Sequence, residues 1–155
     1  MITRPALPED ASGMTTLLNA VIAKGGTTAH EIPMTEADVR EYFIDGSDVH
    51  SAVIAEDEGQ IIGWQSVGQW QGDPHVGTFV QPDLQARGIG GALFAQTLAM
   101  LRQTQIGYII ASIRADNVPG LAYYARIGFR DIGQDPGFAL SDGRVVGRVH
   151  RRFDL

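Results

Sequence analysis

Hydrophobic and polar positions alternate along the chain with two different periods, and each change of period marks a new element. After a short strand at residues 2–4, apolar residues recur at helical spacing, namely Met14, Leu17, Leu18, Val21 and Ile22. Proline and two acids at 8–10 open this helix, and the glycine pair at 25–26 ends it. A second helix begins at Thr35, where Thr-Glu-Ala-Asp resembles a capping box, and stops at Gly46. Residues 27–34 between the two helices have no regular pattern.

The middle of the chain shows the period of strands. Residues 50–55 and 60–70 predict two strands joined by the polar turn at 56–59, which is a hairpin signal. A third strand covers residues 75–81 and ends at Pro82.

Helices and strands then alternate to the end of the chain. One helix runs from Gly88 to about residue 103, with Ile89, Leu93, Thr97, Met100 and Leu101 on one face. A buried strand follows at 108–113, and Asn117 caps a helix over 118–126. Gly128 starts another strand, and the alternation at 145–153 predicts a final antiparallel strand.

The predicted order is β-α-α-β-β-β-α-β-α-β-β, which indicates an α/β fold with one mixed central sheet flanked by about four helices. The 155 residues are the size of one ordinary domain, so we expect residues 1–155 to form a single domain.

Composition narrows the class of protein. Hydrophobic residues make up 44% and charged residues 19%, as in globular proteins, and a net charge of −6 disfavours nucleic-acid binding. The absence of cysteine excludes disulfides, thiolate zinc sites and a cysteine nucleophile. The N-terminus lacks a secretory pattern, and no apolar run approaches the roughly 20 residues that span a bilayer. We therefore expect a cytoplasmic protein that binds neither nucleic acid nor membrane.

The basic residues and histidines do not indicate a binding site of their own. Four of the last twelve residues are arginine, which we interpret as a solvated strand face and not as a polyanion site: Arg144, Arg148, Arg151 and Arg152. The histidines at 30, 50, 75 and 150 show no ligand spacing, so no metal site is expected.

A glycine-rich turn between a strand and a helix is the most informative segment. The glycines at 88, 90 and 91 remove β-carbons that would keep an anion away from the backbone. The first amides of a helix lack intrahelical partners and carry partial positive charge, so they can hold a phosphate group, and Arg87 could add a contact. The segment is not a P-loop, because no Gly-Lys-Ser/Thr follows, and it is not the dinucleotide motif Gly-x-Gly-x-x-Gly, because Leu93 stands where the third glycine belongs. Taken alone, it could also be a tight turn without a ligand.

Two motifs together make the chain resemble the GNAT superfamily of N-acetyltransferases. Gln85-Ala86-Arg87-Gly88-Ile89-Gly90 matches the family signature Gln/Arg-x-x-Gly-x-Gly/Ala. Downstream, Asn117 is followed seven residues later by Tyr124 and then by Gly128-Phe129, as in the second signature. The resemblance covers nearly the whole chain. It implies acetyl-CoA as the co-substrate, a small-molecule amine as the acceptor, and direct attack within a ternary complex.

The resemblance also implies which residues bind the coenzyme. The glycine-loop amides would hold the pyrophosphate, and the strand around Thr78 to Val80 would pair with the pantetheine arm. The implied residues are Thr78, Phe79, Val80, Gln85, Ala86, Arg87, Gly88, Ile89, Gly90, Gly91, Ala92, Asn117 and Tyr124. Tyr124 would protonate the departing thiolate, since a phenol stays protonated at neutral pH. The alternative is a structural Tyr124 whose ring packs against the coenzyme.

The general base is less defined. The chain also resembles phosphinothricin and amino-acid acyltransferases through Thr27-Thr28-Ala29-His30-Glu31 and an N-terminal Arg-Pro-Ala. That group has a glutamate ahead of the motif strand, where this chain has His75. His75 is either a proton acceptor or an ordinary polar residue at a strand end.

Further candidates concern the acceptor. His30 and Glu31 are alternative bases or acceptor-binding residues, since the loop between the first two helices commonly covers this pocket in the family, and Asp73 is a weaker candidate. Trp64 and Trp70 share one strand face, so they either wall the acceptor site or belong to the core or an interface.

Two other functions, and a homodimeric state, remain compatible with the resemblance. The chain could be an acyl-CoA-binding regulatory or sensor domain without catalysis, or an acetyltransferase for protein lysines or N-termini. Family members often dimerise, which makes a homodimer possible.

Overall fold

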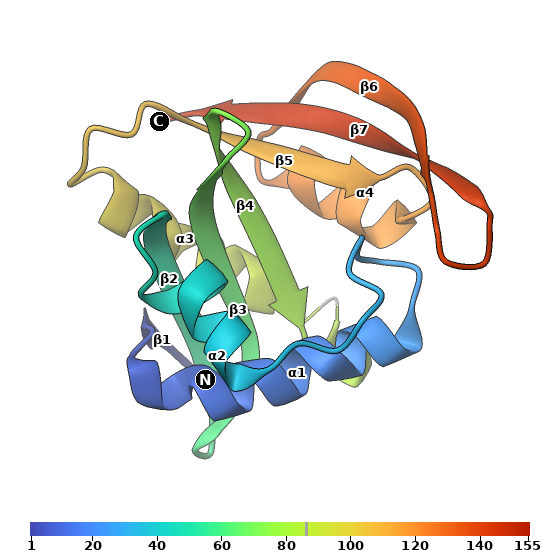
Figure 1. The fold of residues 1–155 in the computed structure, drawn as a ribbon. Coiled ribbons are helices and arrows are strands. Elements are labelled where there is room, and N and C mark those ends of the chain that lie inside the picture. Colours follow the sequence, from blue (N-terminus) through green and yellow to red (C-terminus); the bar gives the residue numbers. More distant parts are fainter. Residues whose placement is uncertain (86) are drawn as a thin grey trace.

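A seven-stranded sheet forms the centre of the computed structural model, which describes residues 1–155 except Ala86 (Figure 1). In spatial order its strands are β1 (Ile2–Pro5), β2 (Val49–Asp57), β3 (Gln60–Trp70), β4 (Asp73–Val80), β5 (Tyr108–Arg114), β7 (Val145–Asp154) and β6 (Arg130–Ala139). All neighbours are antiparallel except β4 and β5, which are parallel. The mixed α/β sheet expected from the sequence is confirmed.

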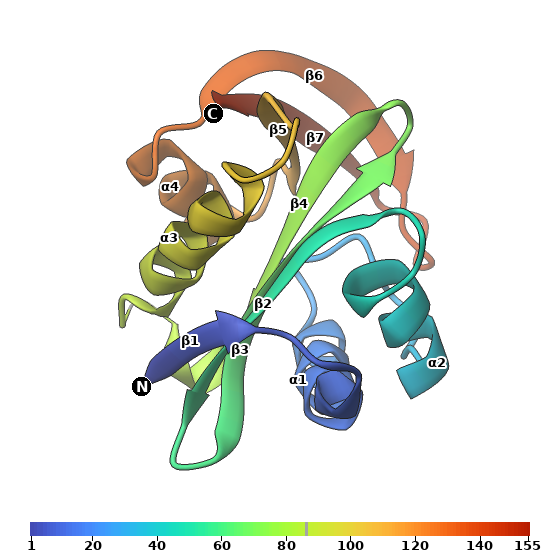
Figure 2. The same cartoon turned by 90° about the vertical axis from the view of Figure 1, so that its left-hand side faces the viewer.

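Helices cover both faces of the sheet. Figure 2 shows α1 (Ala11–Lys24) and α2 (Glu36–Val39) on one face, and α3 (Ile89–Leu101) and α4 (Val118–Arg126) on the other. Short 3-10 turns lie at Pro8–Asp10 and Pro82–Leu84. The element order agrees with the prediction. Among the described residues, no helix is long and apolar enough to cross a membrane.

The second helix is shorter than the sequence pattern indicates. Its start is as expected, because Thr35 Oγ1 accepts a hydrogen bond from the Asp38 amide at 3.1 Å. The α-helical turn then widens into a π-helical segment, Arg40–Ile44, before the chain turns toward β2.

Each helical layer has its own apolar core. Under α1 lie Met14, Leu18, Ile54, Trp64 and Phe79. Under α3 and α4 lie Phe94, Leu101, Ile109, Tyr124 and Phe129. The face predicted for α3 is correct for Ile89, Leu93, Thr97 and Leu101, which are buried. Met100, predicted on the same face, is only partly buried.

The sheet opens between β4 and β5. Their backbones pair only at His75 and Ile110, and the two strands then diverge toward their carboxyl ends (Figure 1). The Gln81 amide donates to the Ile62 carbonyl of β3 at 3.0 Å. Because backbone groups alternate in direction along a strand, those of Thr78 and Val80 point away from β3 and into the gap. The gap therefore offers backbone donors and acceptors to a ligand.

Candidate active site

A cavity of about 1090 Å³ lies where β4 and β5 diverge. Its walls are built from β4, the N-terminal turns of α3 and α4, the α1–α2 loop and the facing side of β5 and β7. The cavity therefore joins the glycine turn at one end to the α1–α2 loop at the other.

The glycine turn leaves amides free at the start of α3. Gly88 caps this helix with φ of 79°, a left-handed conformation that glycine adopts without strain. The first bond within the helix runs from the Ala92 amide to the Gly88 carbonyl (3.2 Å), so the amides of residues 89–91 have no intrahelical partner. A β-carbon on Gly91 would meet no atom within 4 Å. This end of the cavity has both the room and the partial positive charge that an anion requires.

Most of the residues predicted to bind the coenzyme line this cavity. They are Thr78, Phe79, Val80, Gln85, Gly88, Ile89, Gly90, Gly91, Asn117 and Tyr124. Arg87 is exposed and lies outside the lining, and Ala92 lies outside it too, with its amide bonded within the helix. Ala86 is not among the described residues.

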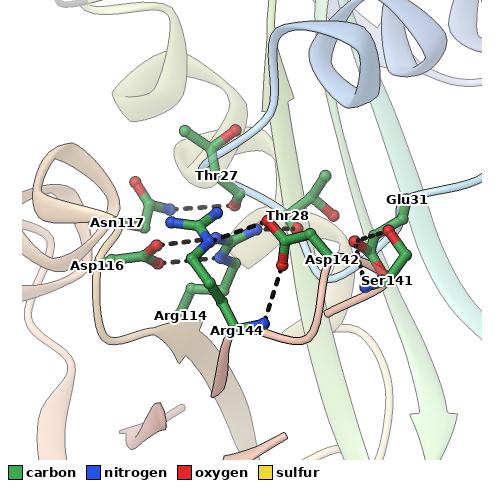
Figure 3. Close-up of polar contacts among 9 residues, drawn as sticks. All are labelled: Thr27, Thr28, Glu31, Arg114, Asp116, Asn117, Ser141, Asp142 and Arg144. Atoms are coloured by element: carbon green, nitrogen blue, oxygen red, sulfur yellow. Dashed lines mark hydrogen bonds and ion pairs between the residues drawn. The ribbon is translucent and has the colours of Figure 1, made fainter. Parts of the chain in front are cut away.

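Asn117 caps α4, as the sequence predicts, and it also contacts the α1–α2 loop. Its Oδ1 accepts from the Gly120 amide at 3.0 Å, which caps α4, and its Nδ2 donates to the Thr27 carbonyl at 3.2 Å (Figure 3). Asn117 thus joins the coenzyme side of the cavity to the α1–α2 loop.

A chain of hydrogen bonds surrounds the Tyr124 hydroxyl. Gln65 Nε2 donates to Thr78 Oγ1 (2.9 Å) and to the Tyr123 hydroxyl (3.1 Å), and Tyr123 donates to the Gly90 carbonyl (2.8 Å). Thr78 Oγ1 lies 2.9 Å from the Tyr124 hydroxyl. Because Thr78 already accepts from Gln65, its own proton can be donated to the Tyr124 oxygen, which leaves the Tyr124 proton for another acceptor.

Burial sets the protonation of both tyrosines. Desolvation raises the pKa of Tyr124 far above that of an ordinary phenol, and it raises the pKa of Tyr123 to about 12. Both hydroxyls therefore keep their protons at neutral pH. The sequence did not indicate Gln65 or Tyr123, since neither belongs to the residues that the two signatures specify.

Two histidines also line the cavity. His75 Nδ1 lies 3.2 Å from the Asp73 carbonyl, and its ring meets Trp70 edge-on with centroids 5.0 Å apart. His30 lies edge-on to Phe43 at 6.1 Å. Desolvation lowers the pKa of both histidines, so their neutral, proton-accepting forms dominate at neutral pH.

Three other candidates have different roles. Trp64 is fully buried and its indole N–H donates to the Met14 carbonyl at 3.1 Å, so it belongs to the core and not to the acceptor wall. Glu31 lies outside the lining because its carboxylate accepts from the Ser141 amide and hydroxyl at 3.0–3.1 Å. Asp73 accepts a hydrogen bond from Tyr108.

The α1–α2 loop is held from two sides, by Arg114 and by the β6–β7 hairpin (Figure 3). The Arg114 guanidinium donates to the Thr28 carbonyl at 3.0 Å and is itself held by Asp116 at 2.8 and 2.9 Å. Glu31 joins the same loop to the β6–β7 hairpin. Among the described residues, which include all but Ala86, no group of three or more His, Asp or Glu side chains is placed to hold a metal ion.

Comparisons with known proteins agree on one family. Residues 15–129 match the sequence model of the acetyltransferase (GNAT) family. The chain is 28% identical to YwnH of Bacillus subtilis, assigned as a phosphinothricin acetyltransferase, over 162 residues that cover 100% of this chain and 95% of YwnH. It is 26% identical to the L-amino acid N-acyltransferase MnaT of Escherichia coli over 112 residues, covering 68% of this chain and 65% of MnaT.

A solved structure shows the same fold. The GNAT superfamily phosphinothricin acetyltransferase from Sinorhizobium meliloti, in complex with acetyl-CoA, superposes with a TM-score of 0.83 at 20% identity. The superposition covers 99% of this chain and 88% of that one.

Proposed function

This chain belongs to the acetyltransferase (GNAT) family, and we propose that it transfers the acetyl group of acetyl-CoA to the amine of a small acceptor by direct attack within a ternary complex. One observation carries the proposal: the gap between β4 and β5 opens beside the free amides of α3, within a single cavity. Relatives named for phosphinothricin and for L-amino acids support a small amine as the acceptor.

The residues present fit acetyl-CoA. The turn at Gly88 and the open space at Gly91 form a cradle that added β-carbons would strain or fill, which suits a pyrophosphate group. The backbone groups of Thr78 and Val80 suit an extended, amide-bearing arm that pairs with the strand edge. Arg126 also lines the cavity, with its guanidinium 5.9 Å from the centre of the Tyr123 ring, and supplies positive charge at the coenzyme side.

When bound, acetyl-CoA supplies the thioester whose acetyl group is transferred. Backbone N–H groups of β4 stabilise the negative charge that develops on the carbonyl oxygen during attack. Tyr124 holds its proton in the ground state and donates it to the sulfur as the thiolate leaves. We assign the donor role in the 2.9 Å bond between Thr78 Oγ1 and the Tyr124 hydroxyl to Thr78, which leaves the Tyr124 proton available for the sulfur.

The amine must lose a proton as the new bond forms. His75 is the residue we assign to this step, either directly or through a water molecule, because it lines the cavity and is held neutral by desolvation. The amine thus gives one proton to His75, and Tyr124 gives one proton to the departing thiolate, which leaves as the thiol.

The closed acceptor end supports a small acceptor over a protein substrate. The α1–α2 loop is bonded to Arg114 and Asn117 at the β5–α4 connection and to Ser141 between β6 and β7. A peptide segment would have to displace these bonds to enter from that side.

A coupled assay for thiol release, run with acetyl-CoA and a panel of amines, tests the proposal. We expect release with at least one amino acid or amino-acid analogue. Tight binding of acetyl-CoA without release for any acceptor would point to a sensor domain, and release with peptides alone would point to a protein acetyltransferase. Failure to bind acetyl-CoA would contradict all three.

The role of His75 has a matched control in the chain. His50 is on the neighbouring part of the sheet, bonds to Gln69 Oε1 at 2.7 Å and lies outside the cavity lining. We expect His75→Gln to lower kcat/KM by about 10²- to 10⁴-fold and His50→Gln to change it less than about threefold. Equal effects of both variants would remove His75 from the mechanism.

A further inference from the structure

Arg148 of β7 lines the cavity without an anionic partner. Its guanidinium carbon lies 4.3 Å from the centre of the Phe138 ring, and its Nε is buried without a hydrogen-bond partner among the described residues. Among those residues it also makes no ion pair with a carboxylate. A buried donor without a partner costs free energy that a suitable ligand atom would recover.

The residues paired with Arg148 across the sheet have other partners. Arg114, opposite on β5, is neutralised by Asp116, whose hydrogen bonds raise the pKa of Arg114 above its usual value. Asp135, opposite on β6, directs its carboxylate to His150 Nε2 at 3.3 Å. Like charges at directly opposed positions destabilise a sheet. A second anion beside Arg148 would therefore reduce the repulsion between the guanidinium groups of Arg114 and Arg148.

The solvated face expected for the C-terminal arginines is therefore only partly correct. The side chain of Arg144 is 66% exposed and pairs with Asp142, as that expectation implies. Arg148 is instead half-buried, and its side of β7 faces the cavity.

We propose that Arg148 binds a carboxylate of the acceptor, so that the acceptor is an amino acid or another amine with a nearby carboxylate. A guanidinium presents parallel N–H groups that match the two oxygens of a carboxylate. Stacking on the Phe138 ring orients the Arg148 guanidinium before the ligand binds. Glu41 and Asp48 also line the cavity and favour positive charge there. A zwitterionic acceptor that arrives as an ammonium ion loses its first proton to solvent before attack, and the neutral amine then gives its second proton to His75. The inference rests on the proposed function.

The chain offers a matched control for the test. Arg152 lies on the same strand and the same face, stacks on Tyr108 at 4.0 Å and pairs with Asp154, but lies outside the cavity lining. Arg148→Met and Arg152→Met each keep an unbranched apolar stem and remove the charge. Both variants should be checked for folding by thermal denaturation.

The kinetic test compares each accepted amino acid with its carboxamide, which keeps the amine and side chain but loses the negative charge. We expect wild type to favour the acid by at least tenfold in kcat/KM. Arg148→Met should lower kcat/KM for the acid by about 10- to 100-fold and for the carboxamide by less than threefold, whereas Arg152→Met should leave the preference intact. Calorimetry of the amino acid with protein saturated in coenzyme A should show the same loss of affinity for Arg148→Met.

Several results would overturn the inference. An equal kcat/KM of wild type for acid and carboxamide, or an equal loss of kcat/KM for both in Arg148→Met, would show that Arg148 does not bind the carboxylate. An equal change in the two arginine variants would assign the effect to surface charge. No thiol release by wild type with any amine would instead contradict the proposed function, so the two failures are distinguishable.

Discussion

Replacing Tyr124 with phenylalanine removes a single oxygen atom from the centre of the cavity. The ring would still pack against Phe129, with centroids 5.1 Å apart, so the core beneath α4 stays filled. The lost oxygen makes one neutral hydrogen bond, to Thr78 Oγ1, and Thr78 keeps its bond from Gln65. Loss of one such bond costs about 0.5–1.5 kcal/mol of folding free energy. For a domain of this size we expect Tm to fall by roughly 2–6 °C.

The effect on turnover should be far larger than the effect on stability. A proton donor positioned at the leaving group contributes about 10²- to 10⁴-fold to the rate, so kcat should fall within that range. The KM for acetyl-CoA should change less than about threefold, because the proton is transferred only in the transition state. Steady-state thiol release at saturating acceptor, with Tm measured on the same preparations, gives both quantities.

Thr78→Val provides the accompanying control. This variant keeps the Tyr124 hydroxyl but removes the group that orients its proton, so we expect an intermediate loss in kcat of about tenfold. If Tyr124→Phe retained kcat within threefold of wild type, the residue would be purely structural, and the Thr78 result would carry no mechanistic meaning.

Two further predictions concern the helix that starts the coenzyme site and the pH dependence of stability. Gly90→Ala should lower the free energy of unfolding by about 1–3 kcal/mol in a denaturant titration, because the new β-carbon would lie 2.6 Å from Tyr123 Cε1. Gly91→Ala meets open space and should leave stability unchanged or raise it by up to about 1 kcal/mol, yet weaken coenzyme A binding about tenfold in calorimetry. Hydrogen bonds from Arg4 at 2.8 and 2.9 Å lower the pKa of the buried Asp10 below 3.8. That stabilisation is present above this pH and is lost as the pH falls through the lowered pKa of Asp10, so Asp10→Asn should flatten the acid side of the pH dependence of unfolding.

The sequence predicted helix starts and turns well where a single side chain or a glycine determines the local backbone conformation. Thr35 and Asp38 make the expected reciprocal cap, and Gly88 adopts the left-handed conformation that ends the glycine turn. The position of β7 between β5 and β6 could not be predicted in the same way. Pairing of residues 108–114 with 145–154 depends on long-range packing, which no local period encodes.

In the site, too, the residues of the sequence signatures could be predicted, whereas the residues that depend on tertiary contacts could not. The two signatures located the glycine turn and Tyr124, whereas the roles of Gln65 and Arg148 arise only when distant strands meet. Trp64 and Trp70 illustrate the limit of strand parity. Both lie on one face, but α1 covers Trp64, whereas Trp70 remains 46% exposed at the cavity.

The central claim is that the first amides of α3 bind the diphosphate of the coenzyme. Amide proton NMR of Ile89, Gly90 and Gly91 during titration with coenzyme A tests it most directly, with pantetheine, which lacks the diphosphate, as the comparison. We expect these three signals to shift and saturate with coenzyme A and to remain in place with pantetheine. Saturable binding of coenzyme A that leaves all three unmoved would contradict the account.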